Sequence, residues 1–229
     1  MTVTAYGKGA TEAVDQAADE ISRLDQLLST GNEDSEIYKI NQSGDGILSE
    51  ETAYLVERSL DLYEATDGAF DIAIYPVMKA WGFTDDNFRV PDADELKDLL
   101  TLTDASDISY DKETSQIAFK KDGMQIDFGG IAKGYTSARI MDIFRACGIK
   151  SGLVNLGGNV QALGTKKDGS SWRVAVQDPQ DTDQYLGVLS IQDKAVITSG
   201  GYERYFEQDG RTYHHIICLL YTSDAADDL

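Results

Sequence analysis

The sequence predicts an α+β protein, because helical patterns fill much of its first hundred residues and short strand patterns cluster later in the chain. The links between the late strands are mostly short, which favours antiparallel pairing. This order of elements differs from that of a doubly wound parallel sheet. We therefore expect N-terminal helices followed by a mainly antiparallel sheet.

The expected helices are read from the spacing of apolar residues and from end signals. A strand-like alternation at Thr2–Tyr6 precedes the first helix, for which apolar side chains recur at helical intervals between Thr11 and Ser29. Ser49 is a suitable N-cap for a second helix that runs to about Ala65. Pro91 begins a short third helix that ends at Leu100, and a fourth runs from Ile131 to about Ala146.

The expected strands follow the third helix and are separated by turn signals. They are Ile108–Tyr110, Gln116–Phe119, Gln125–Phe128, Gly152–Leu156, Asn159–Leu163, Trp172–Gln177, Leu186–Ile191 and Ala195–Thr198. The sequence contains no internal repeat and no low-complexity linker, and its length suits one domain or two small ones.

The chain is strongly acidic: its 229 residues include 40 Asp and Glu against 20 Lys and Arg, which gives a formal net charge of −20. Such a charge repels nucleic acids and anionic membrane surfaces, so we exclude both as partners. Hydrophobic residues make up 41%, as in soluble globular proteins, and no apolar run is long enough to cross a bilayer. Two cysteines are too few for a disulfide framework, and no residue spacing indicates zinc.

The stretch from Ile126 to Tyr135 has the chemistry of a phosphate site. A strand-like run stops at Gly129 and Gly130, and a helical pattern begins at once. Glycines let the main chain approach a ligand, and the first N–H groups of a helix attract an anion. Lys133 adds a cation, and Asp127 adds a carboxylate that could hold a ribose hydroxyl or help to bind Mg²⁺. A tight strand-to-helix turn with a surface lysine is the alternative interpretation of these residues.

Further clusters of polar residues and glycines lie outside the regular elements, at Ser35–Asn41, Gly68–Asp71, Asn155–Asn159, Thr198–Tyr202 and Tyr213–Ile217. Each also has a purely structural interpretation. Asn155–Asn159 fits a hairpin turn, Phe70 fits a core position, and His215 in a strand fits a half-buried histidine with satisfied hydrogen bonds. The order and mixture of the clusters carry more information than any one of them.

Taken together, these clusters resemble the ApbE family, the FAD:protein FMN transferases, over Thr2 to Ile217. The shared segments occur in the family's order: Ser35-Glu36 to Asn41, Gly68–Asp71, Trp81–Phe83, Asp127–Gly134, Asn155–Asn159, Thr198–Tyr202 and His215–Ile217. The resemblance implies an ApbE-like fold in a domain of residues 1–217. It also implies a reaction in which Mg²⁺ assists attack on FAD by a threonine hydroxyl of a target flavoprotein, FMN is attached through a phosphoester, and AMP departs.

The resemblance also assigns roles to single residues. Lys133 and His215 are the implied catalytic residues, with His215 as a contact or proton shuttle near the pyrophosphate. The main-chain carbonyl of Gly130 is the implied Mg²⁺ ligand. The residues implied to contact FAD are Asn41, Ala69, Phe70, Asp71, Asp127, Lys133, Asn155, Ser199, His215 and Ile216.

Two other functions stay open at this point. With water in place of the threonine hydroxyl, the protein would be a Mg²⁺-dependent FAD pyrophosphatase. With the FAD site kept and the metal ligands lost, it would be a non-catalytic FAD-binding remnant. AMP release with and without a target peptide would separate these possibilities, and the sequence leaves the target protein and the oligomeric state open.

The resemblance stops after Ile217. Relatives continue with segments that supply further Mg²⁺ ligands, whereas Cys218–Leu229 matches nothing in the family and is similar to a translated sequencing adapter. We therefore expect residues 218–229 to be foreign to the domain, its C-terminal portion to be missing and its transfer activity to be impaired. The resemblance implies a location at the extracytoplasmic face of a bacterial membrane or in the periplasm. No signal peptide precedes Thr2, so the cytoplasm stays open as well.

Overall fold

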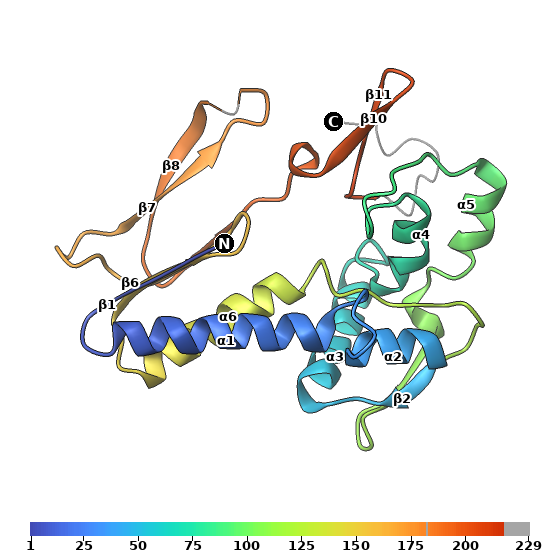
Figure 1. Ribbon diagram of the computed structural model, residues 1–229, viewed down its shortest axis with the longest axis horizontal. Coiled ribbons are helices and arrows are strands. Elements are labelled where there is room, and N and C mark those ends of the chain that lie inside the picture. Colours follow the sequence, from blue (N-terminus) through green and yellow to red (C-terminus); the bar gives the residue numbers. More distant parts are fainter. Residues whose placement is uncertain (182, 218–229) are drawn as a thin grey trace. The chain divides into compact units, whose positions relative to one another are not determined.

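The computed structural model describes residues 1–181 and 183–217 and contains the expected mixture of helices and antiparallel strands (Figure 1). The chain forms two compact units. Unit 1 joins Met1–Asp25 to Ala132–Gly200, and unit 2 joins Gln26–Ile131 to the chain from Gly201 onward. Residues 218–229, which the sequence predicts to be a foreign tail, lie outside the described residues.

Unit 1 is built on a four-stranded antiparallel sheet of order β1-β5-β6-β9. These strands are Thr2–Tyr6, Ser151–Asn155, Asn159–Gly164 and Ala195–Ile197. The helices α1 (Ala10–Leu28) and α6 (Ala132–Ala146), blue and yellow in Figure 1, pack against each other and against this sheet. Their apolar stripes close one core with the strands, made of Ala13, Ala17, Ile140, Met141, Phe144, Ile149, Val154, Leu156 and Leu163.

A hairpin of β7 (Trp172–Gln177) and β8 (Tyr185–Ile191) forms a separate two-stranded sheet in unit 1. Trp172, Val174 and Ile191 bury its inner face against β6, in a second apolar cluster. The remaining large apolar side chains of β8 are exposed. The hairpin is therefore buried where Trp172, Val174 and Ile191 pack on β6, and the rest of β8 is exposed.

Unit 2 combines helices with a three-stranded antiparallel sheet of order β2-β4-β3. Its elements are α2 (Glu36–Ser43), β2 (Asp45–Ile47), α3 (Glu50–Ala65), η1 (Ile72–Ile74), α4 (Tyr75–Ala80), α5 (Ala93–Leu100), η2 (Ala105–Asp107), β3 (Ile108–Asp111), β4 (Gln116–Phe119), η3 (Gly201–Glu203), β10 (Tyr205–Gln208) and β11 (Arg211–His214). Every strand pair in residues 1–181 and 183–217 is antiparallel, which confirms the expected sheet type.

The start of α3 agrees with the prediction, and that of α5 differs from it. Ser49 is the N-cap residue of α3, as predicted, but its side chain makes no capping bond to the helix; its hydroxyl donates to Glu36 Oε2 at 2.6 Å and ties α3 to α2. The helix α5 begins at Ala93, later than predicted, because the Asp92 carboxylate accepts a hydrogen bond from the Glu95 N–H at 2.8 Å. A side-chain cap, rather than a proline at the first turn, sets this helix end.

The predicted strand Gln125–Phe128 is wrong, although its main chain runs without helical structure. No strand pairs with it among the described residues. Instead, the Asn41 side chain bonds the main chain of Ile126, and the Asp127 N–H donates to the Ile72 carbonyl at 2.8 Å. An apolar alternation marks burial of alternate side chains, and here a side chain and a 3₁₀ turn provide the bonds that a neighbouring strand would make.

The apolar pattern also misses the hairpin of β10 and β11. Its rings pack on a cluster from an earlier part of unit 2: Phe206 stacks on Phe88 with centroids 5.2 Å apart, and Tyr213 lies 5.3 Å from the Trp81 ring. His215, expected inside a strand, directly follows β11. Among the described residues, no helix has the length and apolar character needed to span a membrane.

Candidate functional site

The segment Ile126–Gly130 is fixed by side chains that the sequence predicts to be functional. Asn41 is 7% exposed; its Nδ2 donates to the Ile126 carbonyl at 2.9 Å, and its Oδ1 accepts from the Ile126 N–H at 2.8 Å. The Ile131 N–H then donates to the Phe128 carbonyl at 2.9 Å, which closes the glycine turn directly before α6. Asn41 therefore fixes the main chain of the residue that precedes Asp127.

The Asp127 carboxylate folds back over the turn and accepts a hydrogen bond from the Gly129 N–H at 2.7 Å. Burial raises the pKa of Asp127 above its ordinary value, while the Gly129 N–H and the nearby Arg204 guanidinium act in the opposite direction. A half-buried carboxylate beside an exposed glycine turn can anchor hydroxyl groups or a cation.

Gly130 lies against the ring of Phe70. A Cβ added at Gly130 would lie 2.9 Å from Phe70 Cε2, a distance at which one of the two groups must move. The Phe70 N–H donates to the Thr66 hydroxyl at 3.0 Å at the end of α3, and its neighbour Ala69 is exposed. The predicted pair Ala69 and Phe70 thus lies beside the glycine turn, with Phe70 as its immediate neighbour.

Asp71, for which the resemblance implies a contact to FAD, is held by main-chain donors. It is 8% exposed, and its Oδ1 accepts from the Ala73 N–H at 2.7 Å while its Oδ2 accepts from the Ala105 N–H at 3.1 Å. Burial raises the pKa of Asp71, and the two backbone donors partly offset this effect. Both oxygens therefore join η1 to η2.

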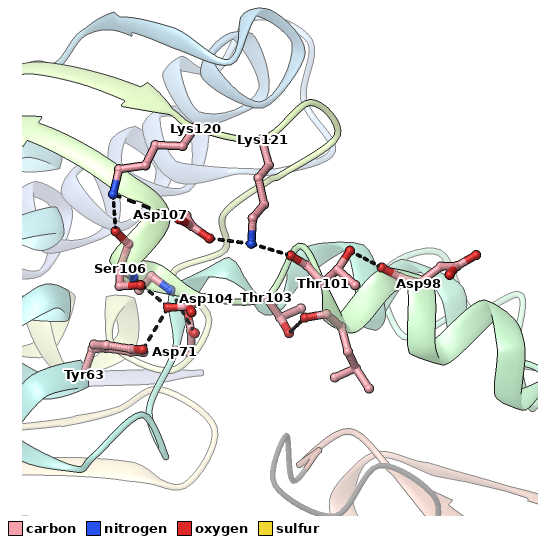
Figure 2. A network of polar contacts seen from close by, with 12 residues as sticks. Tyr63, Asp71, Asp98, Thr101, Thr103, Asp104, Ser106, Asp107, Lys120 and Lys121 are labelled. Carbon is pink, nitrogen blue, oxygen red and sulfur yellow. Dashed lines mark hydrogen bonds and ion pairs between the residues drawn. The ribbon is translucent and has the colours of Figure 1, made fainter.

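Figure 2 shows the polar network around η2. The Tyr63 hydroxyl donates to Asp104 Oδ1 at 2.8 Å, and the same oxygen accepts from the Ser106 N–H at 2.9 Å. The hydrogen bond to Asp104 raises the pKa of Tyr63. Further along, Lys120 Nζ donates to the Ser106 carbonyl at 2.7 Å. Sequence reasoning missed Tyr63 and Asp104, because their contacts join elements far apart in the chain.

His215 and Ile216 follow β11 in unit 2. His215 is half-buried; its N–H donates to the Arg204 carbonyl at 3.1 Å, and its Nδ1 lies 3.1 Å from the same oxygen. Ile216 is 39% exposed. His214, for which the sequence implies no role, has a buried Nδ1 with no hydrogen-bond partner among the described residues.

Three of the predicted residues belong to unit 1. Lys133 is exposed in the first turn of α6, and no ion pair to it occurs among the described residues. Asn155, at the end of β5, accepts from the Gly158 N–H at 3.1 Å through its Oδ1, and the Thr198 N–H donates to the Gly158 carbonyl at 3.2 Å. Ser199 follows Thr198 and is exposed, so unit 1 brings the two glycine-rich breaks together.

The described residues do not form a complete magnesium site. Mg²⁺ requires near-octahedral coordination by several oxygen atoms. In the part of the chain that the structure describes, no group of three or more His, Cys, Asp or Glu side chains could hold a metal ion. The Gly130 carbonyl and one Asp127 oxygen are a partial set at best, because Asp71 is engaged by backbone donors. We therefore derive no chemical step through Mg²⁺.

The fold and these segments define an α+β protein in which unit 2 contributes the glycine turn at Asp127–Gly130 and the buried Asp71, and unit 1 contributes the exposed Lys133 in the first turn of α6. The ApbE family model matches residues 1–219. The chain belongs to the ApbE family. This membership confirms the resemblance, and the antiparallel α+β architecture agrees with the family fold.

Several relatives support the same assignment. The chain is 36% identical to a FAD:protein FMN transferase of Treponema pallidum (strain Nichols), over 94% of this chain and 65% of the relative. It is 34% identical to one of Klebsiella pneumoniae (strain 342), over 86% of this chain and 62% of the relative. The chain thus spans less than two thirds of the length of these curated relatives.

Solved structures of the family superpose closely on this fold. The crystal structure of the ApbE protein from Thermotoga maritima matches with a TM-score of 0.89 and 32% identity, over 95% of this chain and 72% of that one. The apo form of the Pseudomonas stutzeri flavinyl transferase ApbE matches with a TM-score of 0.81 and 30% identity, over 95% and 68%.

Proposed function

We propose that the whole protein is a FAD:protein FMN transferase, which moves FMN from FAD to a threonine of a target flavoprotein and releases AMP. The observation that carries this proposal is family membership combined with the turn at Asp127–Gly130, which leads directly into the first turn of α6 with its exposed Lys133. The positive end of a helix dipole and a mobile cation suit a pyrophosphate. Both lie in a chain whose net charge is −20, so a local positive site is needed for such a substrate.

The transfer breaks a phosphoanhydride bond of FAD and forms a phosphoester bond to threonine. The threonine oxygen forms a bond to the phosphorus on the FMN side of FAD, the bond from that phosphorus to the bridging oxygen breaks, and AMP leaves. The hydroxyl proton passes to a base, for which His215 is the candidate in this chain. Positioning and charge neutralisation supply most of the rate in such reactions, which suits the roles assigned to Asp127 and Lys133.

The Mg²⁺ dependence that the family implies is a prediction of its own. When bound, Mg²⁺ would supply charge neutralisation at the pyrophosphate. AMP formation that stops on addition of a chelator and returns with Mg²⁺ would support it. AMP formation at an undiminished rate in the chelator would contradict it.

The purified product of the full-length gene tests the function, with the purified chain of 229 residues measured beside it. FAD binding is measured by quenching of flavin fluorescence, and AMP is measured with and without a threonine-containing acceptor peptide. Binding with AMP formation only in the presence of the peptide supports the transferase. AMP formation without the peptide favours a FAD pyrophosphatase, and FAD binding without AMP favours a non-catalytic FAD-binding protein. No binding of FAD would contradict all three.

The partners follow from the same proposal: FAD and a flavoprotein that carries the acceptor threonine. A location outside the bacterial cytoplasm stays a prediction of the family resemblance. It is tested by fractionating cells that express the full-length gene and following the protein with an antibody.

A further inference from the structure

Arg204 connects three segments of unit 2 that are far apart in sequence. It lies between η3 and β10, and its guanidinium donates a hydrogen bond to the carbonyl of Phe83, 121 residues earlier in the chain. Its own carbonyl faces His215, and its charge is close enough to Asp127 to influence that carboxylate. Neither the names of the relatives nor the patterns in the sequence indicate a role for Arg204.

We propose that Arg204 is a positioning residue, which fixes the tautomer and the orientation of the His215 imidazole. The proposal rests on the hydrogen bonds that surround Arg204 in the structure. Only the catalytic use of His215 rests on the proposed function.

The tautomer follows from the chemistry of the contact between His215 Nδ1 and the Arg204 carbonyl, which are 3.1 Å apart. A carbonyl oxygen accepts hydrogen bonds and cannot donate them, so Nδ1 must carry the proton. In the neutral ring, Nε2 is then the unprotonated nitrogen. The His215 N–H donates to the same oxygen at 3.1 Å, so the carbonyl holds the residue at its main chain and at its ring.

The orientation of the ring follows from Phe83. The rings of His215 and Phe83 lie edge to face, with centroids 6.5 Å apart and an interplanar angle of 66°. The Arg204 guanidinium holds the carbonyl of the same Phe83, which is 1% exposed. Arg204, Phe83 and His215 thus form a closed set of contacts, in which movement of the arginine would release the other two.

The positive charge of Arg204 also acts on Asp127. An arginine has five N–H donors in a rigid plane, and one group binds Phe83. The positive charge opposes the effect of burial on the pKa of Asp127. Arg204 therefore relates the candidate base His215 to the carboxylate beside the glycine turn, within a single unit of the protein.

In the proposed reaction, this arrangement presents Nε2 as the proton acceptor. The proton of the attacking hydroxyl passes to Nε2, while Nδ1–H remains bonded to the Arg204 carbonyl and stabilises the resulting imidazolium. An imidazole with the opposite tautomer would present a donor to the hydroxyl proton and could not accept it. The positioning role therefore has a direct chemical consequence.

The test reads the tautomer without FAD, so its failure is distinct from failure of the proposed function. The chain has two histidines, and ¹⁵N–¹H NMR couplings of the imidazole distinguish the Nδ1–H form from the Nε2–H form. His214→Gln assigns the signals. We expect the neutral His215 ring to favour Nδ1–H by roughly five-fold, as one net hydrogen bond allows. A neutral His215 that carries its proton on Nε2 would overturn the proposal.

Variants of Arg204 test the positioning itself. Arg204→Met should shift the His215 ring toward a mixture of tautomers, whereas Arg204→Lys, which keeps a donor for the Phe83 carbonyl, should restore much of the native preference. Arg211→Met is the matched control, because Arg211 is an exposed arginine of β11 in the same unit. A folded Arg204→Met protein with an unchanged His215 tautomer would refute the role. If Arg204→Met does not fold, the lysine variant and the native tautomer still decide.

Discussion

The side chain of Asn41 and the main chain of Ile126 form a reciprocal hydrogen-bonded pair, 85 residues apart in sequence. The amide donates at 2.9 Å and accepts at 2.8 Å, as a neighbouring strand would. The pair is buried and fixes the main chain immediately before Asp127. A contact of this kind links the packing of α2 to the geometry of the glycine turn.

Substitution of Asn41 by Asp tests this pair. The aspartate can still accept from the Ile126 N–H, but it places a carboxylate oxygen against the Ile126 carbonyl, where a donor is required. We expect a loss of about 1–3 kcal/mol in the free energy of unfolding, as for other buried groups left unpaired. Urea denaturation at pH 7 measures it. Gln42→Glu is the control, because it adds the same charge on an exposed position of the same helix; an equal loss in both variants would contradict the explanation.

The sequence predicts the helices of this fold better than it predicts hydrogen bonds such as that between Asn41 and Ile126. The helices α1, α3 and α6 have a single apolar stripe, so local periodicity locates them to within a residue or two. The alternation at residues 125–128 reports burial correctly but not hydrogen bonding, because the partner is a side chain from α2. Periodicity contains no information on which distant group forms hydrogen bonds with the N–H and C=O groups of a segment.

The candidate site shows the same limit. Glycines and polar residues identify the turn at Asp127–Gly130, since turn chemistry is local. The tertiary role of Asp71, in contrast, depends on the N–H of Ala105, and that of Arg204 depends on the carbonyl of Phe83. A charged residue in an acidic chain has many possible partners, and only the folded structure selects one.

Asp127→Asn should stabilise the protein at neutral pH while it weakens FAD binding. Burial raises the pKa of Asp127, so the ionised form is costly in the folded state, whereas an asparagine can still accept from the Gly129 N–H. Each kcal/mol gained corresponds to about 2–4 °C in Tm for a chain of this size. A stabilised variant with weaker FAD binding would show that the Asp127 carboxylate serves binding and lowers the stability of the fold.

The pH dependence of this effect has a definite sign. The folded state holds the Asp127 proton more tightly than the unfolded state, so the contribution is complete below the ordinary value of 3.8 and is lost as pH rises through the raised pKa. The stability difference between Asp127→Asn and the native chain should therefore grow with pH and then level off. The exposed Asp122→Asn is the control. A difference that shrinks with rising pH would show that the assigned direction is wrong.

Asp71→Asn should have the opposite effect on stability, although the substitution is chemically the same. Both Asp71 oxygens accept main-chain N–H groups, and an asparagine offers only one acceptor, so one N–H would face an NH₂ group. We expect a loss of about 1–3 kcal/mol in the free energy of unfolding. Thermal and urea denaturation measure it.

Asp104→Asn is the matched control for Asp71→Asn, in the same network of Figure 2. Asp104 Oδ1 accepts from both the Tyr63 hydroxyl and the Ser106 N–H, so the amide oxygen of an asparagine can keep both of these bonds. We expect a loss smaller than that of Asp71→Asn. If Asp104→Asn costs more, the count of acceptors does not govern this network.

Gly130→Ala should weaken FAD binding through Phe70. The new methyl group would lie 2.9 Å from Phe70 Cε2, so the ring must move away from the turn. We expect at least about five-fold weaker binding of FAD, because displaced contacts at a positioned site are costly. Gly187→Ala is the control, since a Cβ there meets nothing within 4 Å. Fluorescence titration of both variants measures the effect, and equal affinities would place Phe70 outside the FAD site.

Lys133→Ala should weaken FAD binding with little change in stability. The side chain is exposed, so its removal should alter the free energy of unfolding by no more than about 0.5 kcal/mol. A charge-assisted hydrogen bond to phosphate contributes about 1.5–3 kcal/mol, which corresponds to a loss of roughly 10- to 100-fold in affinity. Lys150→Ala removes the same charge beyond the opposite end of α6, so it controls for the long-range field. Because the contact is electrostatic, the native chain should lose affinity as salt rises, and Lys133→Ala should lose less. Equal binding by the two lysine variants at low salt would mean that Lys133 does not face the pyrophosphate.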